Sequence, residues 1–365
     1  MTYNGGAKMA KTIIIAEAGV NHNGSLDLAF ELIDQAVAVG ADIVKFQAFN
    51  SSQIVTQSLS KASYQKVNTG GQDSQLAMLK KLELSRADHE RLIEHCQKKS
   101  IKYLSSVFDL QSLNDLVNYF GITEVKLGSG EITNGPLLLK IAQLQCDVIL
   151  STGMCDLVDI QRALSILAFG YLDRSEYPTR ATFEAAFNSV EAQKILKEKV
   201  VLLHCTTAYP APINDINLYA MDTMRNTFLL PVGYSDHSLG INIAIAAVAR
   251  GAIMLEKHFT LDKNLPGPDH KASLDPREFA RMVTAIREVE VALGNAEKKV
   301  TPSELDHFDI VRKHLVAAQT IKKGEKFTER NIAVKRSQGK ISPIYFWEIL
   351  GETADKDYVI DDVIS

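Results

Sequence analysis

The chain alternates short apolar segments of strand character with longer segments of helical spacing, and it completes this alternation eight times. A strand followed by a helix is the repeating unit of parallel α/β proteins. Eight such units in a row favour a (β/α)₈ TIM barrel, with an open doubly wound sheet as the alternative. The expected strands are Thr12–Ala16, Asp42–Phe46, Ile101–Leu104, Glu124–Leu127, Val148–Leu150, Val200–Leu203, Leu229–Val232 and Ala252–Leu255.

The barrel pattern ends near Gly294, which sets the expected domain organisation. We expect a barrel domain at residues 11–295, a linker at 296–307 and a small β-rich C-terminal domain at 308–365. Polar segments interrupt the barrel after the second strand and again at 172–199. Residues 1–10 are polar and contain glycine, so we expect them to be disordered.

The composition indicates which kinds of binding partner and which cellular compartment to expect. Charged residues make up 23% of the 365 residues and the net charge is -4, which argues against nucleic acid or a membrane surface as the main partner. No apolar stretch is long enough to span a membrane, and we expect no signal peptide. The cysteines form no CxxC pair, so we expect a reducing cytoplasm and no disulfide framework. They are Cys96, Cys146, Cys155 and Cys205.

Two histidines follow the last two strand segments, His237 in Ser-Asp-His and His258 in Glu-Lys-His-Phe-Thr. In parallel α/β proteins, ligand chemistry gathers at the carboxyl ends of the strands. Two imidazoles at these ends can form an open site for a catalytic divalent metal. The alternative is that both histidines only bond backbone carbonyls, as half-buried histidines often do.

Other strand segments also end in side chains that can do chemistry. Glu17 is a candidate acid or base, or a cap for the Asn-rich turn that follows it. Alternation along the second strand puts Lys45 and Gln47 on one side, and an inward-facing Lys45 implies a bound anion, because an unpaired buried charge is costly. Lys126 precedes a Gly-Ser-Gly turn whose N–H groups can bind phosphate. Two such lysines favour an anion site over two solvated charges.

The polar strand ends together are typical of a barrel enzyme. The chain has no GxSxG elbow, Walker loop or dinucleotide fingerprint, which argues against serine hydrolase and NAD chemistry.

The chain contains, in order, the segments IAEAGVNHNG, VKFQ, VKLGSGE, LSTGM, HCTTAYP, YSDH and EKHFT. This set resembles the bacterial sialic acid synthases, and the resemblance covers essentially the whole chain. The last part of the chain is similar to the antifreeze-like (SAF) domain of that family. The resemblance implies a cytoplasmic transferase with a (β/α)₈ barrel and an SAF domain, assembled as a homodimer with swapped SAF domains. It also implies a divalent metal, typically Mn²⁺, with Mg²⁺ or Co²⁺ as alternatives.

The resemblance implies that the enzyme condenses phosphoenolpyruvate with N-acetylmannosamine and water to give N-acetylneuraminate and phosphate. His237 and His258 would hold the metal that polarises the open-chain aldehyde, and Glu17 would handle the protons of the water that adds at C2. The phosphoenolpyruvate-binding residues would be Lys45, Ser106, Lys126, Ser129, Ser151, Thr207 and Ser235. The sugar-binding residues would be Gln47, Glu131, Tyr209, Asp269 and, from the SAF domain of the partner subunit, Arg336.

Three alternatives stay open. A legionaminic acid synthase would use 2,4-diacetamido-2,4,6-trideoxymannose with the same chemistry, and the Gly267–Leu274 run does not separate the two sugars. A metal-dependent hydrolase on the same barrel is disfavoured because no His-x-His pair ends the first strand. A non-catalytic sugar-binding protein would have no use for the whole set of charged strand ends.

Overall fold

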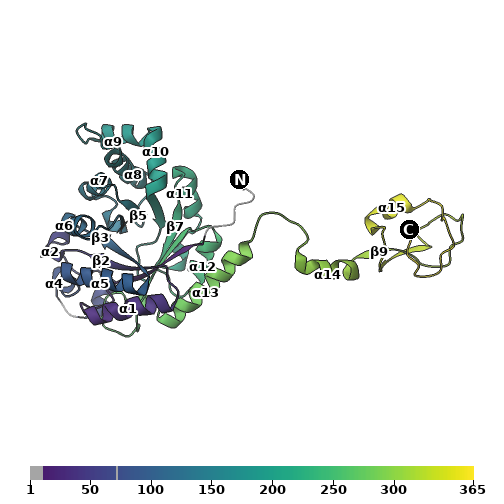
Figure 1. Cartoon of the computed structure of the whole chain (residues 1–365), viewed down its shortest axis with the longest axis horizontal. Helices are drawn as coiled ribbons and strands as arrows, with labels where there is room; N and C mark the ends of the chain where they lie inside the picture. Colours follow the sequence, from purple (N-terminus) through teal and green to yellow (C-terminus); the bar gives the residue numbers. More distant parts are fainter. Residues whose placement is uncertain (1–10, 71–72) are drawn as a thin grey trace. The chain divides into compact units, whose positions relative to one another are not determined.

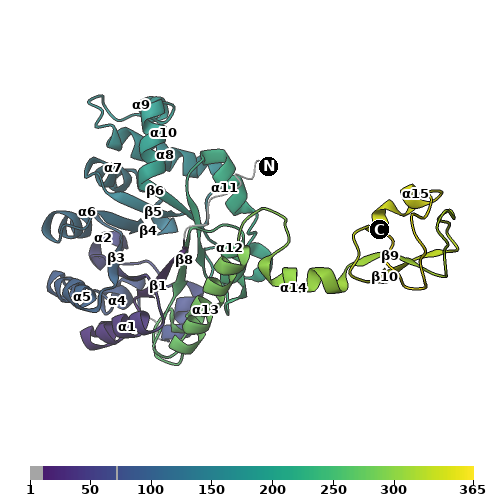
Figure 2. The same ribbon diagram turned by 45° about the vertical axis from the view of Figure 1, so that its right-hand side comes forward.

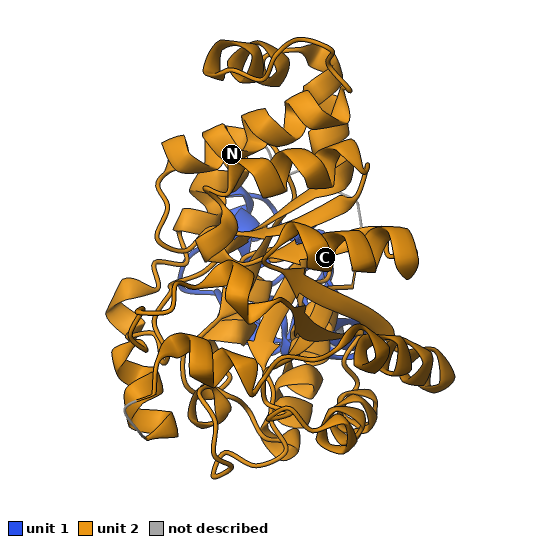
Figure 3. Ribbon diagram, turned by 90° about the vertical axis from the view of Figure 1, so that its left-hand side faces the viewer, with its two compact units in different colours: residues 1–7, 295–365 blue, residues 8–294 orange. Residues whose placement is uncertain are grey.

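The computed structural model of the protein describes residues 11–70 and 73–365. The described chain divides into two compact units, a larger one that ends at Gly294 and a smaller one from Asn295 to Ser365 (Figure 3). Each unit has a hydrophobic core of its own. The disorder expected at residues 1–10 lies outside the described residues.

The larger unit is a closed barrel of eight parallel strands that follow one another in chain order (Figure 1). The first strand pairs with both the second and the last, so Glu17 has Lys45 on one side and His258 on the other. The structure therefore confirms the (β/α)₈ fold predicted from the sequence. The strands are β1 (Ile13–Gly19), β2 (Ile43–Ala48), β3 (Lys102–Val107), β4 (Glu124–Leu127), β5 (Asp147–Ser151), β6 (Val200–His204), β7 (Val232–Asp236) and β8 (Met254–His258).

The inside of the barrel changes from apolar to polar along the strands. Its amino-terminal part is filled by a cluster of buried residues, namely Ile15, Ile43, Leu104, Ile149, Leu203 and Met254. Because side chains alternate sides along a strand, the residues two positions further on share the same interior. These are Glu17, Lys45, Ser106, Ser151, Cys205 and Glu256. An apolar plug thus lies directly beneath a layer that contains three charged side chains.

Helices surround the barrel and cover its outer apolar face (Figure 1). In the first of them, Ala29, Leu32, Ile33 and Ala36 form the buried stripe expected of an amphipathic helix, and Ser25 caps its start by accepting from Leu28 N. The surrounding helices are α1 (Leu26–Ala38), α5 (Arg86–Lys99), α6 (Leu110–Asn114), α7 (Gly135–Gln143), α8 (Leu157–Tyr171), α11 (Ala220–Phe228), α12 (Asn242–Ala249) and α13 (Pro276–Leu293).

The last two strands lie later in the chain than the sequence pattern predicts. The expected strand at Leu229–Val232 is wrong for most of its length, because Leu229 ends α11 in a left-handed conformation and β7 begins only at Val232. The apolar run is shared between a helix end and a strand start. The strand expected at Ala252–Leu255 instead begins at Met254. As a result, His258 is the last residue of β8, and only His237 lies just beyond its strand.

Both polar segments that interrupt the barrel contain helices. The first, which we call the β2 excursion, comprises residues 51–70 and 73–82 and contains α2 (Ser51–Ile54), α3 (Ser63–Thr69) and α4 (Gln75–Lys80). The second contains α9 (Arg180–Phe187) and α10 (Val190–Lys199), which pack on α8 (Figure 1). In the part of the chain that the structure describes, no helix has the length and apolar composition that a membrane crossing needs.

The smaller unit contains an antiparallel pair, β9 (Lys313–Ala317) and β10 (Ile332–Arg336), which lie side by side in Figure 2. Its α-helices are α14 (Pro302–Val311) and α15 (Phe346–Ile349). The first of these begins inside the segment that the sequence pattern assigns to a linker. The core of this unit consists of Leu315, Ala317, Ile321, Phe327, Ile332, Ala354, Tyr358 and Ile364.

A fully buried ion pair joins β7 to β8 on the outer face of the barrel. Lys257 Nζ lies 2.7 Å from Asp236 Oδ2, both side chains are 0% exposed, and Lys257 also donates to Ser238 O. Asp236 Oδ1 accepts from the backbone N–H and the hydroxyl of Ser238. The pair therefore fixes the turn that contains His237.

Replacing Lys257 by methionine should lower the free energy of unfolding by about 3–5 kcal/mol, because Asp236 would remain buried without a counter-charge. Urea denaturation followed by circular dichroism measures the change. The matched control is Lys102→Met, which removes a pair with Glu124 in which the lysine is 53% exposed. That variant should lose less than about 1 kcal/mol. Equal losses in the two variants would contradict the importance of the buried pair.

Candidate active site

A cavity of about 240 Å³ opens at the carboxyl ends of the barrel strands. Among the site residues predicted in the barrel, Glu131 is not part of its lining, and the Glu131 carboxylate instead accepts from Asn134 at 2.8 Å. Arg336 lies in β10 of the smaller unit and is exposed. The predicted residues that do line the cavity are Glu17, Lys45, Gln47, Ser106, Lys126, Ser129, Ser151, Thr207, Tyr209, Ser235, His237, His258 and Asp269.

Four buried charged side chains form the floor of this cavity. Lys45 Nζ lies 3.0 Å from Glu17 Oε2 and 2.9 Å from Glu256 Oε2, and it donates to the Ser106 hydroxyl at 3.1 Å. Lys126 Nζ lies 3.5 Å from Glu256 Oε1. Glu256 is therefore the counter-charge that both lysines share.

The two carboxyl groups of the floor hold protons with different strength. Burial raises the pKa of Glu17 to about 7, although Lys45 opposes the shift. Burial would also raise the pKa of Glu256, but Lys126 and Lys45 outweigh it and hold that pKa well below its ordinary value. When Glu17 carries a proton near neutral pH, the floor has an excess positive charge. A buried excess charge is costly, so the floor favours a bound anion.

Lys126 is the less well compensated of the two lysines. Its ammonium donates to Ser151 Oγ at 2.7 Å and to Leu127 O at 3.3 Å. Burial lowers the pKa of Lys126 in spite of the nearby Glu256. A cation that burial destabilises in this way gains from a further negative charge, so Lys126 is where we expect an anion to contribute most.

Two hydroxyl groups of the cavity lining, those of Ser129 and Thr207, lie close together because residue 153 is a glycine. Gly153 N donates to Ser129 Oγ at 2.9 Å, and a Cβ at position 153 would collide with Thr207 Oγ1 and Ser129 Oγ. Thr207 Oγ1 is buried and has no hydrogen-bond partner among the described residues. An unpaired buried hydroxyl is unfavourable, and an oxygen of a bound anion would satisfy it.

The two histidines face each other, with ring centroids 5.7 Å apart. His237 Nδ1 lies 2.7 Å from Thr206 O, and since a carbonyl can only accept, Nδ1 carries the proton and Nε2 keeps its lone pair. Ser235 Oγ lies 3.3 Å from this Nε2, but its proton goes to the ionised Glu256 at 2.7 Å. The lone pair of His237 Nε2 therefore remains free.

His258 also presents a free nitrogen, because its Nδ1 is buried without a hydrogen-bond partner among the described residues. Burial lowers the pKa of both histidines, so both imidazoles are neutral. Two neutral imidazoles with free lone pairs fit a divalent metal. Within residues 11–70 and 73–365 there is no cluster of three or more His, Cys, Asp or Glu side chains placed to hold a metal, so its other ligands would be water or substrate. The carbonyl bond of His237 is compatible with this role, because such bonds orient metal-binding histidines.

The β2 excursion reaches across the mouth of the barrel. Tyr64 of α3 packs on Tyr209, which follows β6, with ring centroids 5.4 Å apart. Asn68 donates to Pro268 O, beyond β8, at 2.7 Å. Tyr209 in turn packs on His237 at 4.3 Å between ring centroids. The excursion thus roofs the cavity and touches loops that follow strands far from its own origin at β2.

One part of the cavity lining is apolar. It consists of Val20 after β1, Phe108 after β3, and Met78, Leu79 and Leu82 at the end of the β2 excursion, and we call these five residues the apolar wall. They belong to a small hydrophobic cluster that is separate from the main core. The cavity therefore combines a charged floor with an apolar side.

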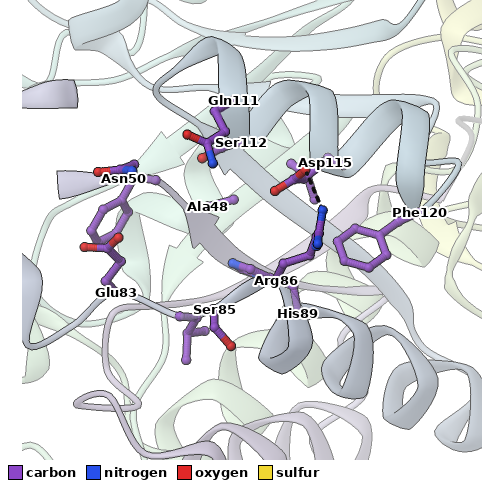
Figure 4. A pocket seen from close by; sticks show the side chains of 13 residues that line it. Ala48, Asn50, Glu83, Ser85, Arg86, His89, Gln111, Ser112, Asp115 and Phe120 are labelled. Carbon is purple, nitrogen blue, oxygen red and sulfur yellow. Dashed lines mark ion pairs between the residues drawn. The ribbon is translucent and has the colours of Figure 1, made fainter. Parts of the chain in front are cut away.

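A second cavity, of about 340 Å³, lies beside α5 and α6 (Figure 4). Its ionic groups already have partners, since Arg86 pairs with Asp115 at 3.6 Å and Glu83 accepts from the Ser51 hydroxyl at 2.7 Å. Its described lining includes no residue that the sequence motifs single out. We therefore place the active site in the cavity over the charged floor.

Sequence reasoning missed several residues of this site. Glu256 lies two positions before His258 in one strand, and alternation could have revealed that both point inward. Tyr64 and the apolar wall gave no such signal, because their place in the site depends on how the β2 excursion folds back over the barrel.

Comparisons with known proteins agree on one family. A family model described as the NeuB family matches residues 32–298. The chain is 48% identical over 356 residues to the N,N'-diacetyllegionaminic acid synthase of Campylobacter jejuni, and the match covers 98% of this chain and 99% of that protein. It is 43% identical over 338 residues to the protein of the same name from Legionella pneumophila, which covers 93% of this chain and 89% of that protein.

A solved structure shares the fold over most of its length. The N-acetylneuraminic acid (sialic acid) synthetase of Leptospira borgpetersenii, crystallised in complex with citrate, superimposes with a TM-score of 0.65 at 33% identity. The superposition covers 82% of this chain and 91% of that chain.

The buried Asp269 makes the free energy of unfolding depend on pH. Burial raises the pKa of Asp269 from 3.8 to about 6, so its contribution to stability is complete below pH 3.8 and is lost as the pH rises through the folded-state value. We expect the free energy of unfolding of the wild type, relative to that of Asp269→Asn, to fall by at most about 3 kcal/mol across this window. Urea denaturation of both proteins at pH values from about 4 to about 7.5 measures this decrease in the free energy of unfolding.

Replacement of the exposed Asp306 by asparagine is the control for the loss of an aspartate elsewhere in the chain. A wild-type stability that keeps a constant offset from Asp269→Asn over the whole range would contradict the burial of this carboxyl group.

Proposed function

Because the chain belongs to the NeuB family, we propose that it is a sugar acid synthase that condenses phosphoenolpyruvate with an N-acyl hexosamine and water and releases phosphate. The observation that carries this proposal is the charged floor. Lys45 and Lys126 are buried at the barrel mouth with Glu256 between them, beside two neutral imidazoles. This arrangement suits an anionic substrate that reacts next to a metal-polarised carbonyl.

We propose 2,4-diacetamido-2,4,6-trideoxymannose as the sugar and N,N'-diacetyllegionaminic acid as the product. The motifs by themselves favoured N-acetylmannosamine. The two legionaminic acid synthases support the other sugar, because they are 48% and 43% identical to this chain while the sialic acid synthetase is 33% identical.

In this proposal the floor and its hydroxyl groups bind phosphoenolpyruvate. Lys45 and Lys126 supply the charge for its carboxylate and phosphate. The hydroxyl groups that would complete its binding belong to Ser106, Ser129, Ser151, Thr207 and Ser235.

The reaction forms one bond between C3 of phosphoenolpyruvate and the aldehyde carbon of the open-chain sugar. The aldehyde oxygen gains a proton and becomes a hydroxyl group. Water adds at C2 and the bond between C2 and the phosphate oxygen breaks, which leaves a C2 carbonyl and inorganic phosphate. Glu17 is suited to handle the protons of this water, because a carboxyl group with a pKa of about 7 can both give and take a proton near neutral pH.

His237 and His258 would hold a divalent metal, for which we propose Mn²⁺ with Mg²⁺ and Co²⁺ as alternatives. When bound there, the metal would act as a Lewis acid toward the aldehyde. Thr206 O keeps the His237 ring in the required tautomer.

The sugar would lie toward the roof of the cavity, in contact with Gln47, Tyr209 and Asp269. Glu131 stays a proposed contact, although it is not part of the present lining. From the family resemblance we further propose that the smaller unit is an SAF domain. It would be swapped within a homodimer, so that Arg336 of the partner subunit reaches the acylamino group.

The proposed function is tested by measuring phosphate release from phosphoenolpyruvate with each of the two aldoses. We expect release only when an aldose is present and faster release with the diacetamido sugar. A chelator should abolish the reaction, and added Mn²⁺ should restore it. Release without any aldose, or none with either, would contradict a synthase. Faster release with N-acetylmannosamine would return the assignment to sialic acid.

Lys126→Ala should raise the KM for phosphoenolpyruvate about ten- to a hundredfold, because a charge-assisted contact to phosphate contributes roughly 1.5–3 kcal/mol. The KM for the sugar should change far less. Steady-state kinetics with each substrate varied in turn measures both constants. The exposed Lys140→Ala is the matched control and should resemble the wild type. An effect confined to the sugar would mean that Lys126 does not contact phosphoenolpyruvate.

A further inference from the structure

We propose that the apolar wall selects the sugar, by favouring a methyl group over a hydroxymethyl group at C6 and an acylated amino group over a hydroxyl at C4. The wall consists of Val20, Met78, Leu79, Leu82 and Phe108. This inference rests on the proposed function and assigns its sugar specificity to particular side chains.

The apolar wall lines the cavity although its side chains are hydrophobic. Val20, Met78 and Leu82 are 4%, 5% and 7% exposed and pack with Phe49, while Leu79 and Phe108 are partly buried against them. The remaining apolar surface of this cluster faces a cavity whose floor is charged. Apolar surface of this kind gains free energy when an apolar group of a ligand covers it.

The two candidate sugars differ in the groups that they can offer to such a surface. N-acetylmannosamine carries hydroxyl groups at C4 and C6, and a hydroxyl pressed against the wall would lose its hydrogen bonds to water. The diacetamido sugar carries a methyl group at C6 and an acetyl methyl group at C4. It can cover the wall without burying an unpaired hydroxyl.

The position of the wall fits the direction in which a bound sugar must run. The aldehyde at C1 has to lie near His237, just beyond β7, and His258, the last residue of β8. C4 and C6 then lie at the other end of the sugar. Four of the five wall residues come from segments that follow β2 and β3, so most of the wall lines a different sector of the mouth from the two histidines.

The β2 excursion that carries most of the wall is held in place at its base, at its far end and from behind. The Ser51 hydroxyl donates at 2.7 Å to Glu83, which lines the cavity of Figure 4, and Asn68 donates to Pro268 O at 2.7 Å across the mouth. Phe49 packs from behind with Met78 and Leu82 of the excursion, and it meets Phe108 edge to face at 6.1 Å. A fixed apolar surface can discriminate between ligands, because it cannot rearrange to give a hydroxyl group a partner.

The first test uses the unmodified full-length protein and a sugar pair that differs only at C6. N-acetyl-6-deoxymannosamine should have a kcat/KM about ten- to a hundredfold higher than that of N-acetylmannosamine. Equal values for the two sugars would overturn the inference for the C6 methyl group. This measurement needs no variant, so it does not depend on how a substitution affects folding.

The second test uses Leu79→Asn, in which a polar amide replaces part of the wall at similar size. The preference for the diacetamido sugar over N-acetylmannosamine, measured as the ratio of kcat/KM values, should fall about tenfold or more. The KM for phosphoenolpyruvate should stay the same. The matched control is Leu59→Asn, which makes the same change in the β2 excursion at a side chain that is 47% exposed and does not line the cavity.

The outcomes separate this inference from the proposed function. If the wild type uses the diacetamido sugar well but Leu79→Asn keeps the full preference, the wall does not select the sugar and the proposed function stands. If the wild type releases no phosphate with the diacetamido sugar, the proposed function fails and the inference fails with it. A loss of preference in Leu59→Asn equal to that in Leu79→Asn would also overturn the inference.

Discussion

The carboxylate of Glu256 is the group on which the rest of the active site depends. It lies between two buried lysines, of which Lys126 has no other carboxylate partner among the described residues and Lys45 has only Glu17, and these lysines keep it ionised. An ionised Glu256 can only accept, so the Ser235 hydroxyl must donate to it, and the lone pair of His237 Nε2 stays free. One carboxylate therefore connects the floor that suits an anion to the imidazole pair that suits a metal.

The neighbouring ion pair on the outer face of the same two strands supports this arrangement. Asp236 and Lys257 alternate with Ser235 and Glu256, so they point away from the cavity and are completely buried between the barrel and its helices. Asp236 also holds the Ser238 N–H and hydroxyl, which fixes the turn around His237. The active-site layer and its support thus come from adjacent residues of two paired strands, which suits a site that must hold its groups in fixed positions.

The sequence predicted the barrel and many of the residues that line its cavity, for identifiable reasons. Strand and helix periodicity is local, and so is the polar residue at the end of each strand, which is why the sequence could place Glu17, Lys45 and Lys126 at the end of the barrel where the cavity lies. The errors came where a local pattern is ambiguous. Leu229 belongs to an apolar run that reads as a strand but ends α11, and the strand expected from Ala252 begins only at Met254. Periodicity does not locate such boundaries well.

The sequence by itself determined the barrel, the order of its strands and the chemistry carried at their ends, because these follow from alternation and spacing within short segments. Only the tertiary structure decided that Glu256 lies between Lys45 and Lys126, since that requires closure of the ring that brings β8 next to β1. Only the tertiary structure decided that the β2 excursion roofs the cavity, with Tyr64 on Tyr209 and an apolar wall beneath. Contacts of this kind join segments far apart in the chain, and their free energy depends on which surfaces meet rather than on any local pattern.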